Sequence, residues 1–250
     1  MTSIYNNFSI NTGFKLPQIQ FKSNPETYIL RTIPDGDSYA SNPINEHFWS
    51  KTDLEAAAKS NPRILEILNK YNLPLKINEK ELENLKNGHA QKTRITAAKI
   101  YSNLPPELKP YVNLPKIQAA ALLHDIGKVL IPNNILNKEG ELTEREWEII
   151  QQHSELGAEL LKSMKIDEEV KNIIKYHHQN ITENGYPELD NTEYNLEMMI
   201  VSLADKYEAL REKRPYKDAM AKEDALALIK EDVTTGKIPV ELFEALKSAV

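Results

Sequence analysis

An apolar run that begins at Ile117 ends in the sequence Leu122-Leu123-His124-Asp125-Ile126-Gly127-Lys128. This stretch places an imidazole and a carboxylate side by side at the end of a segment apolar enough to be buried. Burying a charged pair is costly unless a counter-charge or a metal ion accompanies it. The stretch therefore predicts either a buried ion-pair partner or a metal site, and the other polar residues of the chain decide between them.

The composition limits the class of protein. The chain has 250 residues, of which 40% are apolar and 27% are charged, which suits one large globular domain with or without an appendage. The absence of Cys excludes disulfides, thiolate zinc sites and cysteine nucleophiles. The formal net charge of -6 disfavours polymeric nucleic acid as a partner, so an anionic substrate needs local positive charge or a metal.

The sequence also lacks targeting signals. The first residues have neither the basic region nor the apolar core of a signal peptide. No apolar run approaches the ~20 residues of a membrane span. We therefore expect a cytoplasmic protein that makes no membrane contact.

Helical signals begin at Thr52, where Thr52-x-x-Glu55 has the pattern of a capping box. Asn61-Pro62 marks a second helix start, because Asn is a favoured N-cap and Pro a favoured first helical residue. The apolar spacing predicts one helix from Asn78 to about Ser102. Further helices are predicted from Pro115 to His124-Asp125, after Thr143, from about Asp167 to His178, from Met198, and near 221–231 and 239–249, with a loop from Ile131 to Gly140. The predicted fold class is all-α.

Residues 1 to about 50 differ from the rest, since they are rich in Asn, Ser, Thr and Pro and show no sustained helical period. Glu26 to Ile33 is the segment whose composition favours a short strand. We expect a mostly irregular arm, followed by short accessory helices, on which a protein partner could dock.

Imidazoles and carboxylates suitable for a metal site recur after residue 88. Five of the six histidines fall between residues 89 and 178, on or at the end of predicted helices. Any one of them alone would more often be a surface or hydrogen-bonded residue, and the pair His177-His178 could simply favour a helix C-terminus. Their clustering favours a metal site instead. The seven candidate ligands are His89, His124, Asp125, His153, His177, His178 and Asp205.

Imidazole and carboxylate donors suit Fe, Mn, Co, Ni or Zn. Seven donors are enough for two metals if one carboxylate bridges them, and Asp125 is the natural bridge beside His124. Two metals about 3.5–4 Å apart can hold a hydroxide between them and clamp a phosphoryl group during in-line displacement.

The order of these residues resembles a known family. His89, His124-Asp125 and Asp205 match the H…HD…D pattern of the HD superfamily of metal-dependent phosphohydrolases. The similarity extends to its HD-GYP subfamily over about residues 78–240. The further motifs are His124 to Lys128, Ile131-Pro132, Ile135 to Lys138, His177-His178 followed by Gly185-Tyr186-Pro187, Ala204 to Leu210, and Arg214-Pro215-Tyr216-Lys217. The predicted division is an N-terminal arm with accessory helices over 1–77 and an HD-GYP-like domain over 78–250.

The resemblance implies an all-α bundle that hydrolyses cyclic dinucleotides, chiefly cyclic di-GMP, in bacterial signalling. The products would be a linear dinucleotide or mononucleotides. Two divalent metals are implied, with Fe or Mn favoured over Zn, Co or Ni. One metal would be held by His89, His124, Asp125 and Asp205, and the second by Asp125, His153, His177 and His178. Lys128 would act at the scissile phosphate, and Tyr186, Arg214 and Lys217 would contact substrate.

The sequence departs from the family pattern at several positions. The family commonly has Glu where this chain has Gln179, Asp-Gly where it has Thr182-Glu183, and Asp where it has Glu208. Members with three metals have Glu at the position of Leu85, so two metals are expected. Two alternatives stay open, namely an HD phosphohydrolase of another nucleotide and a non-catalytic regulatory protein that binds a cyclic dinucleotide or a protein partner.

Overall fold

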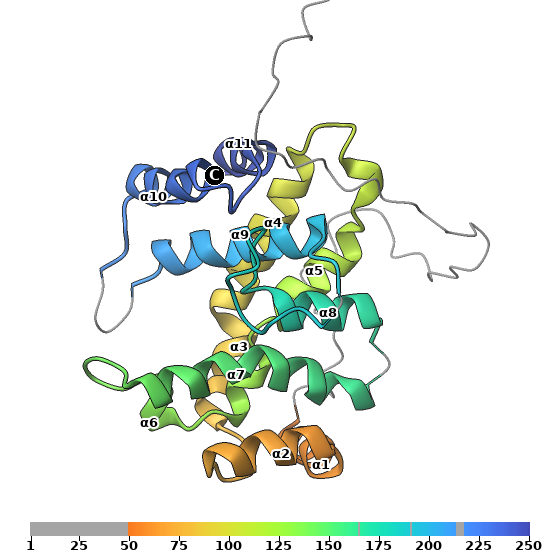
Figure 1. The fold of residues 1–250 in the computed structure, drawn as a ribbon, viewed down its shortest axis with the longest axis vertical. Coiled ribbons are helices and arrows are strands. Elements are labelled where there is room, and N and C mark those ends of the chain that lie inside the picture. The colour runs from red at the N-terminus through yellow and green to blue at the C-terminus, as the bar shows by residue number, and fades with distance from the viewer. Residues whose placement is uncertain (1–49, 165, 191, 214–217) are drawn as a thin grey trace, which may run out of the picture. The chain divides into compact units, whose positions relative to one another are not determined.

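The computed structural model describes residues 50–164, 166–190, 192–213 and 218–250. The predicted irregular arm, the strand-like segment at 26–33, Arg214 and Lys217 lie outside these residues. Residues Asn45–Val250 form one compact unit. Within the described ranges the regular elements are all helical, which confirms the predicted all-α fold (Figure 1). None of the described helices is both long and apolar enough to cross a bilayer.

Eleven α-helices are found in the described residues. They are α1 (Lys51–Ser60), α2 (Pro62–Tyr71), α3 (Glu79–Asn87), α4 (His89–Ser102), α5 (Leu114–Leu123), α6 (Asn133–Leu136), α7 (Glu144–Leu160), α8 (Glu168–Tyr176), α9 (Leu196–Arg211), α10 (Lys222–Thr234) and α11 (Val240–Ala249). Three short 3-10 segments join them, η2 (Lys109–Tyr111), η3 (Ile126–Leu130) and η4 (Leu161–Ser163).

Helix α5 lies in the middle of the bundle and contacts α4, α8 and α9 (Figure 1). This position explains the apolar run of the sequence, because a helix covered on several sides has no polar face. Ile117, Ala120 and Ala121 are fully buried, and Leu122 and Leu123 nearly so. The helix ends at Leu123, so His124 and Asp125 emerge from it inside the protein rather than at its surface.

Helices α1 and α2 pack against α7 and belong to the same compact unit as the predicted HD-GYP-like domain. Asn61 joins them to it. Its Oδ1 caps α2, while its Nδ2 donates 3.0 Å hydrogen bonds to the backbone and side-chain oxygens of Glu159. The predicted division of the chain at residues 77 and 78 stays a prediction.

Three details of the predicted helices were wrong. The helix expected from Asn78 to Ser102 is broken at Gly88, whose φ of −116° and ψ of −131° are not helical, so His89 begins a new helix. The N-cap of α1 is Ser50, which accepts from the Asp53 N–H, rather than Thr52. The loop expected after Ile131 contains the short helix α6.

Candidate metal centre and active site

The seven predicted metal ligands converge on one region from five helices. His89 is the first residue of α4, and His153 lies in the buried face of α7. His124 and Asp125 directly follow α5, and His177 and His178 directly follow α8. Asp205 comes from α9. The residues that follow helix ends are held close to the bundle core by helices that are themselves buried.

One group of donors surrounds Asp205. The Nε2 atom of His89 lies 2.8 Å from Oδ1 of Asp205. The Nε2 atom of His124 lies 3.5 Å from the same oxygen and 3.3 Å from Oδ2 of Asp125. His89, His124 and Asp125 each offer a ligand atom within 4.8 Å of the others, and so do His124, His177 and Asp205.

A second group surrounds His153. Its Nε2 atom lies 3.4 Å from Nε2 of His177 and 3.2 Å from Nε2 of His178. It also lies 3.4 Å from Oδ1 of Asp125. Asp125 therefore presents one carboxylate oxygen to the His124 side and the other to the His153 side. This arrangement suits a carboxylate shared by two metal ions.

Three of the rings are oriented by their own helices. The Nδ1 atoms of His124, His153 and His177 lie 2.7–2.8 Å from the backbone carbonyl oxygens of Ala121, Ile150 and Ile174, each three residues earlier. A carbonyl only accepts, so Nδ1 carries a proton, and in the neutral form of each ring the lone pair is on Nε2, toward the centre. Metal-binding histidines commonly have their second nitrogen fixed in this way.

The buried Nε2 atom of His124 supplies a direct test of whether a metal fits. This residue is fully buried, and no hydrogen-bond partner reaches its Nε2 atom. A buried polar atom without a partner is costly and requires an explanation. A cation between His124 and the two carboxylates would provide one, so the donor set fits a divalent metal.

Burial keeps the imidazoles of the second group neutral. It lowers the pKa of His153 to about 3 and that of His178 to about 4, and it holds the pKa of His177 well below its usual value. Metal ligation requires the neutral form of the ring. The second group is therefore in its ligating state at neutral pH.

The two carboxylates are ionised. Burial opposes their charge, but His124 and Lys128 hold the pKa of Asp125 far below its usual value, and His124 and His89 do the same for Asp205. Burial also opposes a proton on His124, yet Asp125 and Asp205 outweigh it and raise the pKa of His124 to about 10. Without a metal, His124 is therefore protonated between the two carboxylates, and a divalent cation bound there would replace this proton.

The turn after His124-Asp125 positions Lys128. Segment η3 packs on α7, and a Cβ atom at Gly127 would lie 1.9 Å from the carbonyl oxygen of His153. Only glycine allows so close an approach. The Nζ atom of Lys128 then lies 2.7 Å from Oδ2 of Asp125, so the residue predicted to act at the scissile phosphate contacts the predicted bridging carboxylate.

A family model described as HD domain matches residues 77–239. The chain belongs to the HD-domain family. The predicted resemblance to HD phosphohydrolases and their HD-GYP branch is confirmed by this match and by the relatives. Phosphohydrolases with an HD domain depend on metals, in agreement with the His and Asp groups of this HD domain.

The relatives of this HD domain are named as cyclic-dinucleotide phosphodiesterases. It is 37% identical over 135 residues to 3'3'-cGAMP-specific phosphodiesterase 3 of Vibrio cholerae, covering 54% of this chain and 29% of that protein. It is 38% identical over 142 residues to a cyclic di-GMP phosphodiesterase of Thermotoga maritima, covering 54% of this chain and 38% of that protein. The chain thus matches well under half of the length of either relative.

Among solved structures, the HD domain is similar to Bd1817, an HDG"Y"P protein from Bdellovibrio bacteriovorus. The sequence identity is 22% and the TM-score is 0.48, with 63% of this chain and 51% of that chain covered.

The Gly185-Tyr186-Pro187 loop of the HD domain lies over the second group of donors. The Tyr186 ring packs on His178 with their centroids 4.6 Å apart. The buried side chain of Gln179, where the family commonly has Glu, accepts from the Gly185 N–H at 3.1 Å and donates to the Pro187 carbonyl at 2.7 Å. An amide can do both, whereas a carboxylate only accepts. Gln179 therefore makes two hydrogen bonds to this loop, and an ionised Glu could make only one of them.

Two residues near the site of the HD domain escaped the sequence-based prediction. Oε2 of Glu212 lies 3.4 Å from Nδ1 of His89. The sequence offered one signal for Glu212, which is its position seven residues after Asp205. Residues seven apart share a helix face. The Trp147 side chain is 48% exposed, and its ring lies 6.4 Å from that of Tyr186. Nothing local in the sequence links Trp147 to Tyr186.

Glu208, which stands where the family commonly has Asp, accepts a hydrogen bond from the hydroxyl of Thr96. This bond joins α9 to α4, the helices that carry Asp205 and His89. Leu85, where members with three metals have Glu, is buried in α3 and precedes the break at Gly88. The expected number of two metals stays a prediction.

Proposed function

We propose that this HD domain is a metal-dependent phosphodiesterase of cyclic dinucleotides, and that cyclic di-GMP is the first substrate to test. The observation that carries the proposal is the position of Asp125. Its two oxygens lie 3.3 Å and 3.4 Å from the Nε2 atoms of His124 and His153, which belong to the two separate donor groups. A site of this kind suits two metals acting on one phosphoryl group.

The first metal would be held by His89, His124, Asp125 and Asp205, and the second by Asp125, His153, His177 and His178. When bound, such a pair activates water at neutral pH and stabilises charge on phosphate oxygens. Nitrogen and oxygen donors without sulfur accept Fe or Mn, which the HD-GYP resemblance favours, and also Zn, Co or Ni.

The side chains around the metals supply binding and charge. Lys128 is held beside Asp125 and offers an ammonium group to the oxygens of a phosphate at the centre, where negative charge develops during cleavage. Tyr186 lies against His178 and offers a ring surface to a base. Arg214 and Lys217 would contribute further phosphate or guanine contacts, as the HD-GYP pattern implies.

The names of the relatives support this class of substrate but differ in the dinucleotide, which is 3'3'-cGAMP for one and cyclic di-GMP for the other. The test is therefore a panel of substrates with protein purified without oxygen and analysed for metal. The panel contains cyclic di-GMP, 3'3'-cGAMP, cyclic di-AMP and linear nucleotides, and products are separated by chromatography.

We expect hydrolysis of at least one cyclic dinucleotide, and loss of both turnover and bound metal in Asp125→Ala. Asp224→Ala, at an exposed position of α10, should change neither. Turnover by the Asp125 variant, or failure of the metal-loaded protein to cut any cyclic dinucleotide, would contradict the proposal. Tight binding without any product would favour a regulatory, non-catalytic protein instead.

A further inference from the structure

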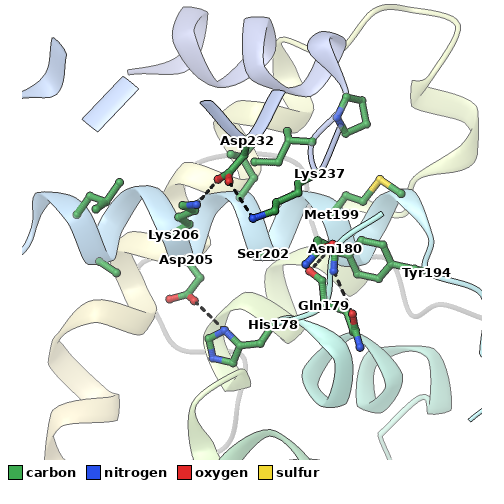
Figure 2. Close-up of a pocket in the computed structure, with 15 residues that line it drawn as sticks. His178, Gln179, Asn180, Tyr194, Met199, Ser202, Asp205, Lys206, Asp232 and Lys237 are labelled. Atoms are coloured by element: carbon green, nitrogen blue, oxygen red, sulfur yellow. Dashed lines mark hydrogen bonds and ion pairs between the residues drawn. The ribbon is translucent and has the colours of Figure 1, made fainter. Parts of the chain in front are cut away.

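An open cavity of about 430 Å³ adjoins the metal centre (Figure 2). His178 and Asp205 line it at the metal centre, and Lys206, Asp232 and Lys237 also line it. In Figure 2 the three charged residues lie on the other side of α9 from the contact between Asp205 and His178. The volume falls within the range of about 300–1,000 Å³ found for small-molecule sites.

The charged end of this cavity has an excess of positive charge. Oδ2 of Asp232 accepts a hydrogen bond from Lys206, and its Oδ1 lies 3.9 Å from Nζ of Lys237. The Lys206 and Lys237 side chains are 41% and 38% exposed, whereas that of Asp232 is only 15% exposed. Two ammonium groups that share one carboxylate keep donors available for an anion, and Asp232 holds them in place.

The backbone fixes the position of Lys237. Its N–H donates to the carbonyl oxygen of Asp232 at 2.8 Å, which closes the turn between α10 and α11. Gly236 adopts a φ of +74° in this turn, a conformation that favours glycine. Lys237 is therefore held at the cavity by a defined turn rather than by a loose loop.

Much of the rest of the lining is apolar and includes Met199, Leu203, Leu210, Ile238 and Pro239. Apolar side chains suit the flat faces of bases, which stack on apolar and aromatic side chains. The cavity thus combines a metal-binding region, an apolar surface and a cationic end.

We propose that Lys206 and Lys237 bind the second phosphodiester group of the substrate, the group that is not cut, while the scissile phosphate lies at the metal centre. This inference rests on the proposed function, because only a cyclic dinucleotide presents two such groups joined through two nucleosides. Asp232 acts as a positioning residue for both lysines. Charge-assisted hydrogen bonds of this kind are among the strong ones in proteins.

The test compares Lys206→Met and Lys237→Met with the unchanged protein on two substrates. For cyclic di-GMP, or whichever cyclic dinucleotide the panel selects, each variant should raise KM about tenfold, as expected for a lost charge-assisted bond, and leave kcat within about twofold. For the linear dinucleoside monophosphate GpG, which has a single phosphodiester group, KM should not change. Lys247→Met removes an exposed lysine of α11 and should have no effect on either substrate.

A binding measurement gives a readout that does not depend on turnover. Calorimetric titration of the cyclic dinucleotide into chelator-treated protein should show the same tenfold weakening in both lysine variants. Asp232→Asn should raise KM without lowering kcat, since it loosens the lysines but does not touch the metal centre. If that variant unfolds, the two lysine variants still decide the matter.

The possible failures are distinguishable. An unchanged KM and unchanged binding in both lysine variants, with an active parent protein, would overturn this inference and leave the proposed function intact. An equal rise in KM for GpG would also overturn it, because the lysines would then bind the scissile group. A parent protein that cuts no cyclic dinucleotide would overturn both.

Discussion

Gly127 and His153 are in direct backbone contact, because a Cβ atom at residue 127 would lie 1.9 Å from the carbonyl oxygen of His153. This contact joins η3, which follows Asp125, to helix α7, which carries His153. Because residue 127 has no side chain, the segments that carry Asp125 and His153 can lie in contact.

Gly127→Ala should destabilise the protein and weaken metal binding, because α7 must move away from η3. Forcing extra atoms into packed interiors typically costs about 1–3 kcal/mol. Thermal unfolding and metal content measure the two effects. Gly157→Ala is the matched control, since its Cβ would meet no atom closer than 3.2 Å and should cost less. Normal stability and full metal content in Gly127→Ala would contradict this view of the contact.

Lys128→Met should lower kcat about 100-fold while metal content is retained, because under the proposed function the ammonium group beside Asp125 acts on phosphate rather than on the metal. Lys128→Arg, which keeps the charge but changes its shape, should recover part of the loss. Turnover and metal analysis on the same preparations provide the measurement. If the variant loses metal in parallel with activity, the role of Lys128 is instead to hold Asp125 in position for metal binding.

Trp147 should report substrate binding by its fluorescence. Trp147 is 48% exposed beside Tyr186, so part of it is accessible to a base. The chain has two tryptophans, and Trp49→Phe leaves Trp147 as the only one, whose emission can be excited apart from that of tyrosine. A cyclic dinucleotide should quench this emission, and Trp147→Ala should raise KM about tenfold, within the range of base–aromatic stacking. Emission that is unchanged at saturating ligand would refute a stacking role.

Glu146 should make the stability of α7 depend on pH. Its hydrogen bond with Lys138, followed by those with Thr143, lowers its pKa from 4.5 to about 2. A carboxyl group whose pKa is depressed by folding stabilises the protein above its unfolded pKa and loses that contribution as the pH falls. Glu146→Gln should therefore be less stable than the parent at pH 7, with the difference vanishing between about pH 4.5 and 2.

Denaturant unfolding of the parent and of Glu146→Gln over this pH range measures the effect. Glu144→Gln removes the same charge from the same helical turn but lies outside the capping box that Thr143 and Glu146 form at the start of α7. Its difference from the parent should vary less with pH. A constant difference between Glu146→Gln and the parent across the range would contradict the prediction.

The sequence was sufficient for the fold class, because helices are marked by local patterns, and it also supplied a set of candidate ligands that stays a prediction. The apolar run into His124 and Asp125 identified a buried helix end, and capping residues such as Asn61, Asn78 and Thr143 marked helix starts that the structure confirms. The structure also brings all seven candidate ligands together, although their division between two metals stays a prediction.

The features that sequence reasoning missed depend on contacts between distant segments. The break at Gly88 lies within a segment that was predicted as one helix, because a single glycine does not end a helix by rule. The pairing of Lys206 with Asp232 joins residues 26 positions apart, and the approach of Trp147 to Tyr186 joins two different elements. Such pairs become visible only when the helices are packed.

The rings of His124, His153 and His177 are oriented by carbonyl groups of their own helices, three residues earlier in each case. Every amino acid carries such a carbonyl, so no substitution of Ala121, Ile150 or Ile174 can remove the acceptor itself. Orientation of these ligands thus requires no partner side chain that evolution would have to preserve. A centre built in this way can tolerate wide sequence drift around it, provided that the ligands remain and their helices stay folded.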